Sequence, residues 1–351
     1  TYFYRVRSAN AACGQMTTSS NTISILVSTG PAAPTVSTIT QATCANPTAR
    51  VVLNGLPAGE WTLQFSTGQT FTGSGTSATI SDLAPNNTFT AAVKTGTCYS
   101  PNSSNIVLNP LVVTTSAWNG SGWSSPPTIN NNIVFTGNYT STGDLSGCTC
   151  TVNSGVTVTV NSGHTFTITN AVTTGGTLIF ENNASLVQTN DVSNTGDIIY
   201  KRNSFPMKNF DYTYWSSPIA DQRPYDLSPN TLSDKYFSYN ASTSNWFQES
   251  PVSAMTVGKG YIIRTPKAGL WPNGENVVFP YAQPVRFIGV PNNGGVFGEQ
   301  ITSLTATRNF LIGNPYPSAL NADLFLQANS SILEGTIYLW THNTAIAPSG
   351  S

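Results

Sequence analysis

The chain contains Asn153-Ser-Gly-Val-Thr-Val-Thr-Val160, followed directly by Asn161-Ser-Gly-His-Thr-Phe-Thr-Ile168. The two stretches form a tandem near-repeat with an offset of 8 residues. In each, apolar side chains alternate with threonine, the period-2 pattern of a β-strand with one buried face. Asn-Ser-Gly supplies turn residues between the strands. We therefore expect a small parallel β-solenoid, in which each rung buries its apolar face on the next. An antiparallel stack of hairpins is the alternative.

The alternating apolar runs predict an all-β protein, and the composition predicts that it has low charge. Charged residues make up 8% of the 351 residues, hydrophobic residues 39% and aromatic residues 11%. That hydrophobic fraction is enough for packed cores, while Thr, Ser and Asn provide solubility in place of charge. The net charge of -1 leaves no basic surplus for nucleic acid phosphates. No apolar run reaches the roughly 18 residues of a membrane span. We therefore expect that the chain does not bind nucleic acid and does not cross a membrane.

The distribution of charge divides the chain near Lys201. Residues 1–200 carry 10 charged side chains, and residues 201–351 carry 19. Together with the turn-rich breaks, this predicts a series of tandem β-modules. They are the final strands of a truncated domain at 1–30, a β-sandwich at 31–110, a short parallel β-solenoid at 111–200, and an aromatic-rich β-sandwich or jelly-roll-like module, incomplete at its C-terminal end, at 201–351.

The first module begins on a strand, Thr1-Tyr-Phe-Tyr-Arg-Val-Arg7, and a second strand is expected at Asn21–Val27. Two strands do not form a stable domain alone. We therefore expect a piece of a longer protein, with loss of flanking regions by cleavage as the alternative. The Tyr-x-Tyr-x-Val pattern resembles the penultimate strand of a fibronectin type III or similar immunoglobulin-like domain.

The second module has strands spaced by about ten residues, as in a β-sandwich. We expect them at Val36–Thr40, Arg50–Leu53, Trp61–Ser66, Ser77–Ile80 and Thr88–Lys94. Two stretches, Gly55-Leu-Pro-Ala-Gly-Glu-Trp-Thr-Leu63 and Ile80-Ser-Asp-Leu-Ala-Pro-Asn-Asn-Thr-Phe-Thr90, resemble the repeat domain of the giant surface adhesins of gliding Bacteroidota. Phe89 stands where that family more often has tyrosine. The resemblance implies an immunoglobulin-like adhesin repeat.

Trp118-Asn-Gly-Ser-Gly-Trp123 precedes the solenoid strands. We expect this segment to cap the first rung, because an uncapped stack presents an open edge.

The last module contains Asp211-Tyr-Thr-Tyr-Trp-Ser-Ser-Pro218 and Gly313-Asn-Pro-Tyr-Pro-Ser318. These stretches resemble a module found near the C-terminal side of large secreted Bacteroidota proteins, which usually continue into a sorting domain for the type IX secretion system. The resemblance implies export through the periplasm to the cell surface or medium. The partners would be the outer-membrane translocon and its shuttle, engaged through a domain after Ser351. Helical spacing predicts one short helix at Ala319–Ala328, with Ser318 as its N-cap.

Five cysteines are present: Cys13, Cys44, Cys98, Cys148 and Cys150. Because Cys44 and Cys98 bracket the second module, we predict a disulfide between them, which in the chain-entropy model contributes about 4 kcal/mol. Cys148 and Cys150 lie two apart on an expected strand, where a direct bond would be strained. They are either buried together as small hydrophobes or a partially oxidised pair. Cys13 pairs upstream of Thr1 or has no partner.

The sequence predicts no enzyme, cofactor or metal site. It lacks the motifs of serine hydrolases, zinc peptidases and phosphate-binding loops. Residues 95–180 contain one acid, Asp144, whereas glycoside hydrolysis needs two acids about 5–10 Å apart. Aromatic clusters are the best candidates for binding, because exposed rings stack on sugars. The candidate glycan contacts are Tyr212, Tyr214, Trp215 and Trp246, although core packing explains the same residues equally well.

These observations predict a non-catalytic structural or adhesive segment of a large secreted or cell-surface protein, in which gliding-related adhesion is what the resemblance implies. The alternative is a carbohydrate-binding accessory region of a secreted polysaccharide-degrading enzyme, with a surface polysaccharide as the ligand.

Overall fold

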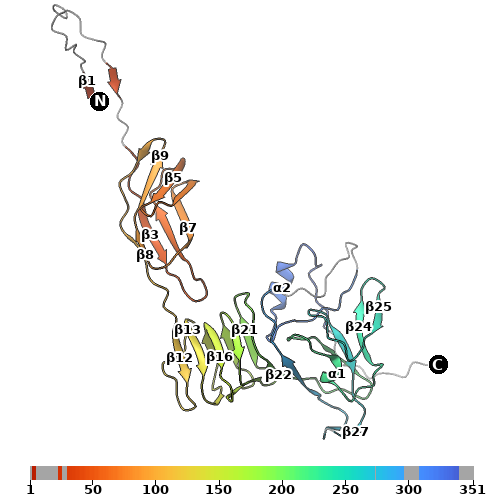
Figure 1. Cartoon of the computed structure of the whole chain (residues 1–351). Helices are drawn as coiled ribbons and strands as arrows, with labels where there is room; N and C mark the ends of the chain where they lie inside the picture. The colour runs from red at the N-terminus through yellow and green to blue at the C-terminus, as the bar shows by residue number, and fades with distance from the viewer. Residues whose placement is uncertain (1, 5–22, 26–29, 273, 296–307, 340–351) are drawn as a thin grey trace, which may run out of the picture. The chain divides into compact units, whose positions relative to one another are not determined.

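The computed structural model describes residues 2–4, 23–25, 30–272, 274–295 and 308–339. It is an all-β fold made of several sheets and a β-solenoid, as expected from the sequence (Figure 1). The chain divides into two compact units, one up to Leu111 and one from Val112 onward. The expected boundary near Lys201 falls inside a single strand of the second unit.

The first unit is built of antiparallel sheets. Its strands are β1 (Tyr2–Tyr4), β2 (Ile23–Ile25), β3 (Thr35–Thr40), β4 (Ala49–Asn54), β5 (Glu60–Phe65), β6 (Thr70–Ser74), β7 (Ser77–Leu83), β8 (Asn87–Phe89), β9 (Ala91–Thr95), β10 (Cys98–Tyr99) and β11 (Ile106–Leu108). One sheet has the order β3-β4-β7 and another the order β10-β9-β5-β6, while β1 pairs with β2 and β8 with β11. Alternate residues of both larger sheets enter one shared core, which contains Leu53, Leu63 and Val93.

The expected strand at Thr88–Lys94 is instead two strands. β8 pairs with β11, whereas β9 pairs with β5 and β10. The break lies at Thr90, whose N–H donates to the Ser66 hydroxyl oxygen and whose carbonyl accepts from the Ser66 N–H. This segment therefore changes sheets at one residue, which its uninterrupted apolar alternation did not predict. The short strand β6 was also not predicted.

The solenoid in the second unit has about four turns. Its strands are β12 (Thr114–Trp118), β13 (Asn131–Phe135), β14 (Tyr139–Thr140), β15 (Leu145–Gly147), β16 (Thr149–Val152), β17 (Thr157–Val160), β18 (Thr165–Ile168), β19 (Val172–Thr174), β20 (Thr177–Phe180), β21 (Ser185–Gln188) and β22 (Ile198–Asn203). They form three parallel sheets, β12-β13-β16-β19, β14-β17-β20-β22 and β15-β18-β21. The parallel pairing confirms the solenoid over the hairpin stack.

The tandem near-repeat lies within one turn of the solenoid. Its halves form β17 and β18, which belong to two different sheets. Neighbouring turns have a longer offset, because Val158 pairs with Leu178 and Leu178 with Ile198. The 8-residue period is therefore the length of one strand and its corner, while one turn takes 20 residues at these positions.

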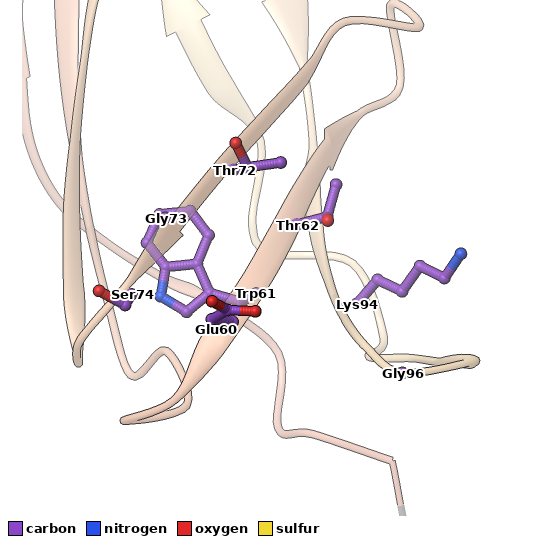
Figure 2. A pocket seen from close by; sticks show the side chains of 8 residues that line it. All are labelled: Glu60, Trp61, Thr62, Thr72, Gly73, Ser74, Lys94 and Gly96. Carbon is purple, nitrogen blue, oxygen red and sulfur yellow. The ribbon is translucent and has the colours of Figure 1, made fainter.

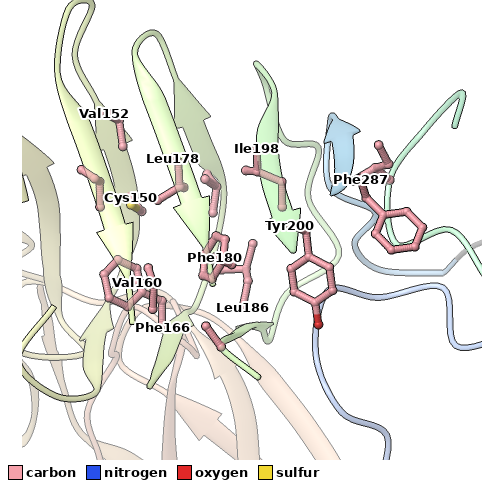
Figure 3. Close-up of a cluster of buried hydrophobic side chains, with 14 of the residues drawn as sticks. Cys150, Val152, Val160, Phe166, Leu178, Phe180, Leu186, Ile198, Tyr200 and Phe287 are labelled. Carbon is pink, nitrogen blue, oxygen red and sulfur yellow. The ribbon is translucent and has the colours of Figure 1, made fainter. Parts of the chain in front are cut away.

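The interior of the solenoid is filled by the alternate apolar residues of its strands (Figure 3). A row of aromatic rings runs along it. Phe166 lies 6.2 Å from Phe135 and 6.0 Å from Phe180, measured between ring centroids. The row continues from Phe180 to Tyr200 at 6.3 Å and from Tyr200 to Phe287 at 6.4 Å. Each turn thus contributes a buried ring to one continuous core.

The first turn is covered by two tryptophans. Trp118 and Trp123 form an isolated antiparallel bridge, and their rings lie 5.5 Å apart. Both rings contact Tyr139, at 5.1 Å and 5.6 Å. The segment therefore packs over the start of the aromatic row, as expected for a cap.

The C-terminal part of the second unit is joined to the solenoid. Its elements are β23 (Tyr212–Trp215), α1 (Pro224–Leu227), β24 (Tyr236–Asn240), β25 (Asn245–Gln248), β26 (Tyr261–Arg264), β27 (Gly269–Leu270), β28 (Asn276–Val277), β29 (Pro284–Gly289) and α2 (Ala322–Ala328). β23-β26-β24-β25 form an antiparallel sheet, and β29 pairs antiparallel with β22. Lys201, the expected module boundary, pairs with Arg286 in this contact.

The described residues after Lys201 do not form the expected separate β-sandwich or jelly roll. Buried residues of the four-stranded sheet, among them Tyr236 and Ile263, belong to the same core as the solenoid interior. The reason is that β22 has no further turn to cover it, so β29 and the neighbouring sheet bury its apolar residues instead.

The short helix begins later than expected. Its N-cap is Asn321, whose side chain accepts from the Leu324 N–H at 3.0 Å, in place of Ser318. The Ser318 carbonyl accepts from Asn314 at 2.6 Å, so Ser318 belongs to the preceding loop.

The predicted Cys44–Cys98 disulfide is wrong. Cys44 is buried and disulfide-bonded, whereas Cys98 carries a free thiol. Cys44 lies between β3 and β4, while Cys98 begins β10 in the other sheet. Cys148 is disulfide-bonded at the corner between β15 and β16, and Cys150 is a free, buried thiol of the solenoid core. Cys13 lies outside the described residues.

Candidate functional site

A hollow of about 370 Å³ lies where the last solenoid turn meets the C-terminal sheet. We call it the junction pocket. It is lined by Asn183, Ser185, Tyr200, Arg202, Tyr214, Trp215, Ser216, Pro218, Phe287, Asn314, Tyr316, Ser318 and Ala319. Its volume is in the range of small-molecule sites, and it combines rings with several polar side chains, as such sites do.

β22 supplies the charged group of the pocket. Tyr200 and Arg202 are two apart on this strand and so share a face. The Arg202 guanidinium lies over the Tyr200 ring, 3.7 Å from its centroid. Its Nη1 donates to the carbonyls of Lys201 at 2.7 Å and Glu181 at 3.3 Å. Its Nη2 donates to the Ala184 carbonyl at 2.6 Å and to the Tyr200 hydroxyl.

These contacts fix the guanidinium against the last turn of the solenoid. Burial lowers the pKa of Arg202 and raises the pKa of Tyr200, while the charge of Arg202 opposes the shift at Tyr200. The guanidinium remains charged, because arginine titrates far above neutral pH.

β23 supplies Tyr214 and Trp215. The Trp215 ring packs edge-on against Phe287, with centroids 6.2 Å apart, and so continues the aromatic row of the core. Its indole Nε1 is buried and has no acceptor among the described residues. Burial also raises the pKa of the Tyr214 hydroxyl.

The loop at residues 313–318 closes the pocket. Gly313 is required there, because a Cβ would lie 2.1 Å from the Cβ of Ser216. The Ser216 hydroxyl donates to the Asn314 carbonyl at 2.8 Å. The Asn314 side chain spans the loop: its amide donates to the Ser318 carbonyl and its oxygen accepts from the Tyr316 N–H at 3.1 Å.

The same loop holds the last turn of the solenoid. The Leu186 N–H of β21 donates to the Pro317 carbonyl at 2.8 Å. The Tyr316 hydroxyl donates to the Gly294 carbonyl at 2.6 Å. The Gly-Asn-Pro-Tyr-Pro-Ser stretch is therefore a loop that joins the solenoid end to the C-terminal part and lines the junction pocket.

Residues 113–350 match a family described as a domain of unknown function, DUF8693. The chain belongs to the DUF8693 family. The match begins beside the boundary between the two compact units and includes the solenoid together with the C-terminal part. No curated protein matches the chain.

The DUF8693 domain brings two of the four predicted glycan contacts together. Tyr214 and Trp215 line the junction pocket, whereas Tyr212 and Trp246 do not. Tyr212 packs edge-on against Phe237, with centroids 6.1 Å apart. Trp246, on the edge strand β25, is 47% exposed and contacts Tyr239. Trp246 is thus a surface ring outside the junction pocket.

Sequence reasoning missed the other half of the pocket. Lys201 and Arg202 are the first lysine or arginine residues after Lys94, but this change in charge was interpreted as a module boundary and not as part of a site. The loop at residues 313–318 was recognised as a motif, but only the fold places it beside β22 and β23.

A larger hollow of about 570 Å³ lies on the first unit, lined by Glu60, Trp61, Thr62, Thr72, Gly73, Ser74, Lys94 and Gly96 (Figure 2). Its one large ring, Trp61, is only 7% exposed and lies against Gly73, where a Cβ would come within 2.5 Å of it. Trp61 Nε1 donates to the Gly75 carbonyl at 2.8 Å. Because the Trp61 ring is packed in the core and is not available to a ligand, the junction pocket is the stronger candidate for a ligand-binding site.

Within the described part of the DUF8693 domain and the first unit, no group of three or more His, Cys, Asp or Glu is placed to hold a metal ion. No helix among those residues is long and apolar enough to cross a membrane. Asp144 has a structural contact, since its carboxylate accepts from the Thr165 N–H of the next turn at 2.8 Å.

Proposed function

We propose that this chain is a non-catalytic segment of a secreted or cell-surface protein, and that it extends and displays that protein. The observation that carries this proposal is the continuous core of the second unit, which runs from the Trp118 cap through the solenoid to Phe287 and Trp215. A core without a break resists bending between its turns, which suits a spacer. Repeat proteins gain this stiffness from the contacts of each turn with its neighbours.

The first unit serves in this proposal as an immunoglobulin-like adhesin module. The sheet orders β3-β4-β7 and β10-β9-β5-β6 support this interpretation, because two antiparallel sheets around one core form the architecture of that class. Its resemblance to adhesin repeats at 55–63 and 80–90 supports a role in gliding-related adhesion.

The proposed export route is the type IX secretion system. The resemblance of the loop at residues 313–318 supports it, and the disulfide bonding of Cys44 and Cys148 is consistent with an oxidising compartment such as the periplasm. The outer-membrane translocon and its shuttle would engage a sorting domain located after Ser351.

Two experiments test display and export. Protease treatment of intact cells should release this segment, and its deletion should reduce attachment to surfaces. Removal of everything after Ser351 from the native gene should leave the protein in the periplasm. Wild-type levels of the truncated protein at the surface or in the medium would overturn the export route, and a segment that stays protected in intact cells would overturn display.

A second candidate function is carbohydrate binding, as an accessory region of a polysaccharide-degrading enzyme. The observation that favours it is the junction pocket, where Tyr214 and Trp215 lie beside polar groups. A glycan array tests it, with Tyr214→Ala as the pocket variant and Trp246→Ala as the variant of a surface ring outside the pocket. Binding lost only in Tyr214→Ala assigns the pocket, whereas absence of binding to every glycan removes this candidate.

A further inference from the structure

The junction pocket contains a positive charge that no carboxylate balances. Among the described residues, the ion pairs are Lys201–Glu181, Arg223–Asp226, Lys235–Asp234 and Lys259–Glu249, and none includes Arg202. The four hydrogen bonds of Arg202 go to three backbone carbonyls and one hydroxyl. Its neighbour Glu181 is engaged by Lys201, with 2.7 Å between Nζ and the carboxylate oxygen.

The walls of the pocket leave this charge uncompensated. None of the lining residues is acidic, and Arg202 is the one cationic residue among them. A partly buried charge without a counter-ion is costly in a folded protein. An anionic ligand beside the guanidinium would supply that counter-ion. Because Arg202 is fixed by backbone carbonyls, its charge is held in place before the ligand arrives, which lowers the cost of binding.

The remaining lining has the chemistry of a saccharide site. Tyr200, Tyr214, Trp215 and Tyr316 are aromatic residues of the lining, and aromatic rings pack against the apolar faces of sugars. Asn183, Ser185 and Ser318 supply polar groups.

We propose that the junction pocket binds an acidic saccharide, with the acid group beside the Arg202 guanidinium and a sugar ring against aromatic residues of the lining. This proposal rests on the second candidate function and specifies its ligand class. The Arg202 Nη groups are already bonded, so the acid group is recognised by the positive charge and the remaining Nε–H. Hydroxyl groups of the saccharide bind the amide and hydroxyl side chains of the lining.

The test compares ligands that differ only in charge. Calorimetry on the whole chain measures binding of an oligogalacturonate, its methyl ester, a sulfated galactose oligosaccharide and the same galactose oligosaccharide without sulfate. We expect at least one acidic saccharide to bind about 10-fold or more tightly than its neutral counterpart at low salt, with a smaller difference in concentrated salt because ions screen the charge. The carboxylate and sulfate arms then identify the acid group.

Variants locate the site. Ala319 is exposed at the edge of the pocket, so Ala319→Trp should fill the opening and weaken binding about 10-fold or more. Ala268 is also exposed but does not line the pocket, so Ala268→Trp is the matched control and should leave binding unchanged. Arg202→Gln should remove the preference for the acid over its ester, and thermal unfolding shows whether this variant is folded.

The outcomes separate the proposal from the function on which it rests. Equal affinity for the acid and its ester overturns the acidic ligand and leaves Arg202 a purely structural residue, while carbohydrate binding stands. Acid-selective binding that Ala319→Trp does not weaken overturns the pocket assignment. Absence of binding to all four saccharides overturns both.

Discussion

At the scale of single residues, the thiols of Cys98 and Cys150 lie in contrasting surroundings. Cys98 is partly exposed at the start of β10, whereas Cys150 is 1% exposed in the solenoid core. Burial raises the pKa of Cys150 to about 12. A cysteine reacts as its thiolate and must be accessible to the reagent. Cys98 should therefore react in the folded protein, whereas Cys150 should not.

We expect an alkylating reagent at pH 8 to label Cys98 in the native chain without reductant. Cys150 should be labelled only after unfolding, and Cys44 and Cys148 only after unfolding and reduction. Peptide mapping by mass spectrometry reads each position separately. Rapid native labelling of Cys150, increasing between pH 7 and pH 9, would contradict its burial in the solenoid.

Tyr236 makes the stability of the second unit sensitive to alkaline pH. Its side chain is 1% exposed, and its hydroxyl donates to the Ser228 carbonyl at 2.6 Å. Burial raises its pKa to about 12, against an ordinary value of about 10. The unfolded chain therefore loses this proton first as pH rises. The contribution is complete below about pH 10 and decreases as pH rises towards 12.

We expect Tyr236→Phe to cost about 1 kcal/mol near pH 7, through loss of one hydrogen bond. Above pH 10 the variant should lose stability less steeply than the wild type. Urea unfolding at several pH values between 8 and 11.5 measures both effects. If the free energy of unfolding fell equally steeply above pH 10 in the wild type and the variant, Tyr236 would not hold its proton more tightly in the folded state than in the unfolded state.

At the scale of elements, the corners of the solenoid differ in how closely neighbouring turns approach. Gly163 and Gly196 both have a φ of +81°, a region that favours glycine. A Cβ on Gly163 would meet nothing within 4 Å, whereas a Cβ on Gly196 would lie 2.0 Å from the Thr174 carbonyl oxygen. The two positions therefore form a matched pair that separates backbone strain from close packing.

We expect Gly163→Ala to cost about 1–2 kcal/mol, from the left-handed backbone alone. Gly196→Ala should cost clearly more, about 3 kcal/mol or above, because Thr174 belongs to a paired strand and cannot move freely. Chemical denaturation of the two variants measures the difference. Equal costs would show that the last two turns are not packed as closely as described.

At the scale of the whole molecule, the two units have separate cores. Phe166 of the solenoid and Phe287 of β29 belong to one core, while Leu63 of the first unit belongs to another. Residues that share a core unfold together in small domains. The solenoid and the C-terminal part should therefore unfold in one transition, despite the change from parallel to antiparallel pairing at β22.

We expect Phe166→Ala and Phe287→Ala to lower the same calorimetric transition, each by about 3–5 kcal/mol in the free energy of unfolding. Leu63→Ala should lower a different transition and leave the first unaffected. If the two phenylalanine variants lowered different transitions, the solenoid and the C-terminal part would be separate domains, with a boundary near Lys201 as the charge distribution suggested.

The sequence by itself determined the all-β class, the solenoid and its Trp118–Trp123 cap. These features depend on alternation between neighbouring residues and on turn chemistry, which are local properties of the chain. It also indicated which stretches were unusual, including the loop at residues 313–318. It did not predict the length of a solenoid turn, because an 8-residue repeat fits both one strand with its corner and a whole rung.

Only the tertiary structure decided which distant segments meet. The pairing of β22 with β29, the free thiol of Cys98 and the junction pocket all depend on contacts between residues far apart in the chain. Such contacts follow from how the open end of the solenoid is covered, and many β-segments of similar composition could have covered it. Arg202 and Tyr316 illustrate this point: each lies in a stretch that the sequence marked as distinct, but both line one pocket because the last turn and the loop at residues 313–318 pack together.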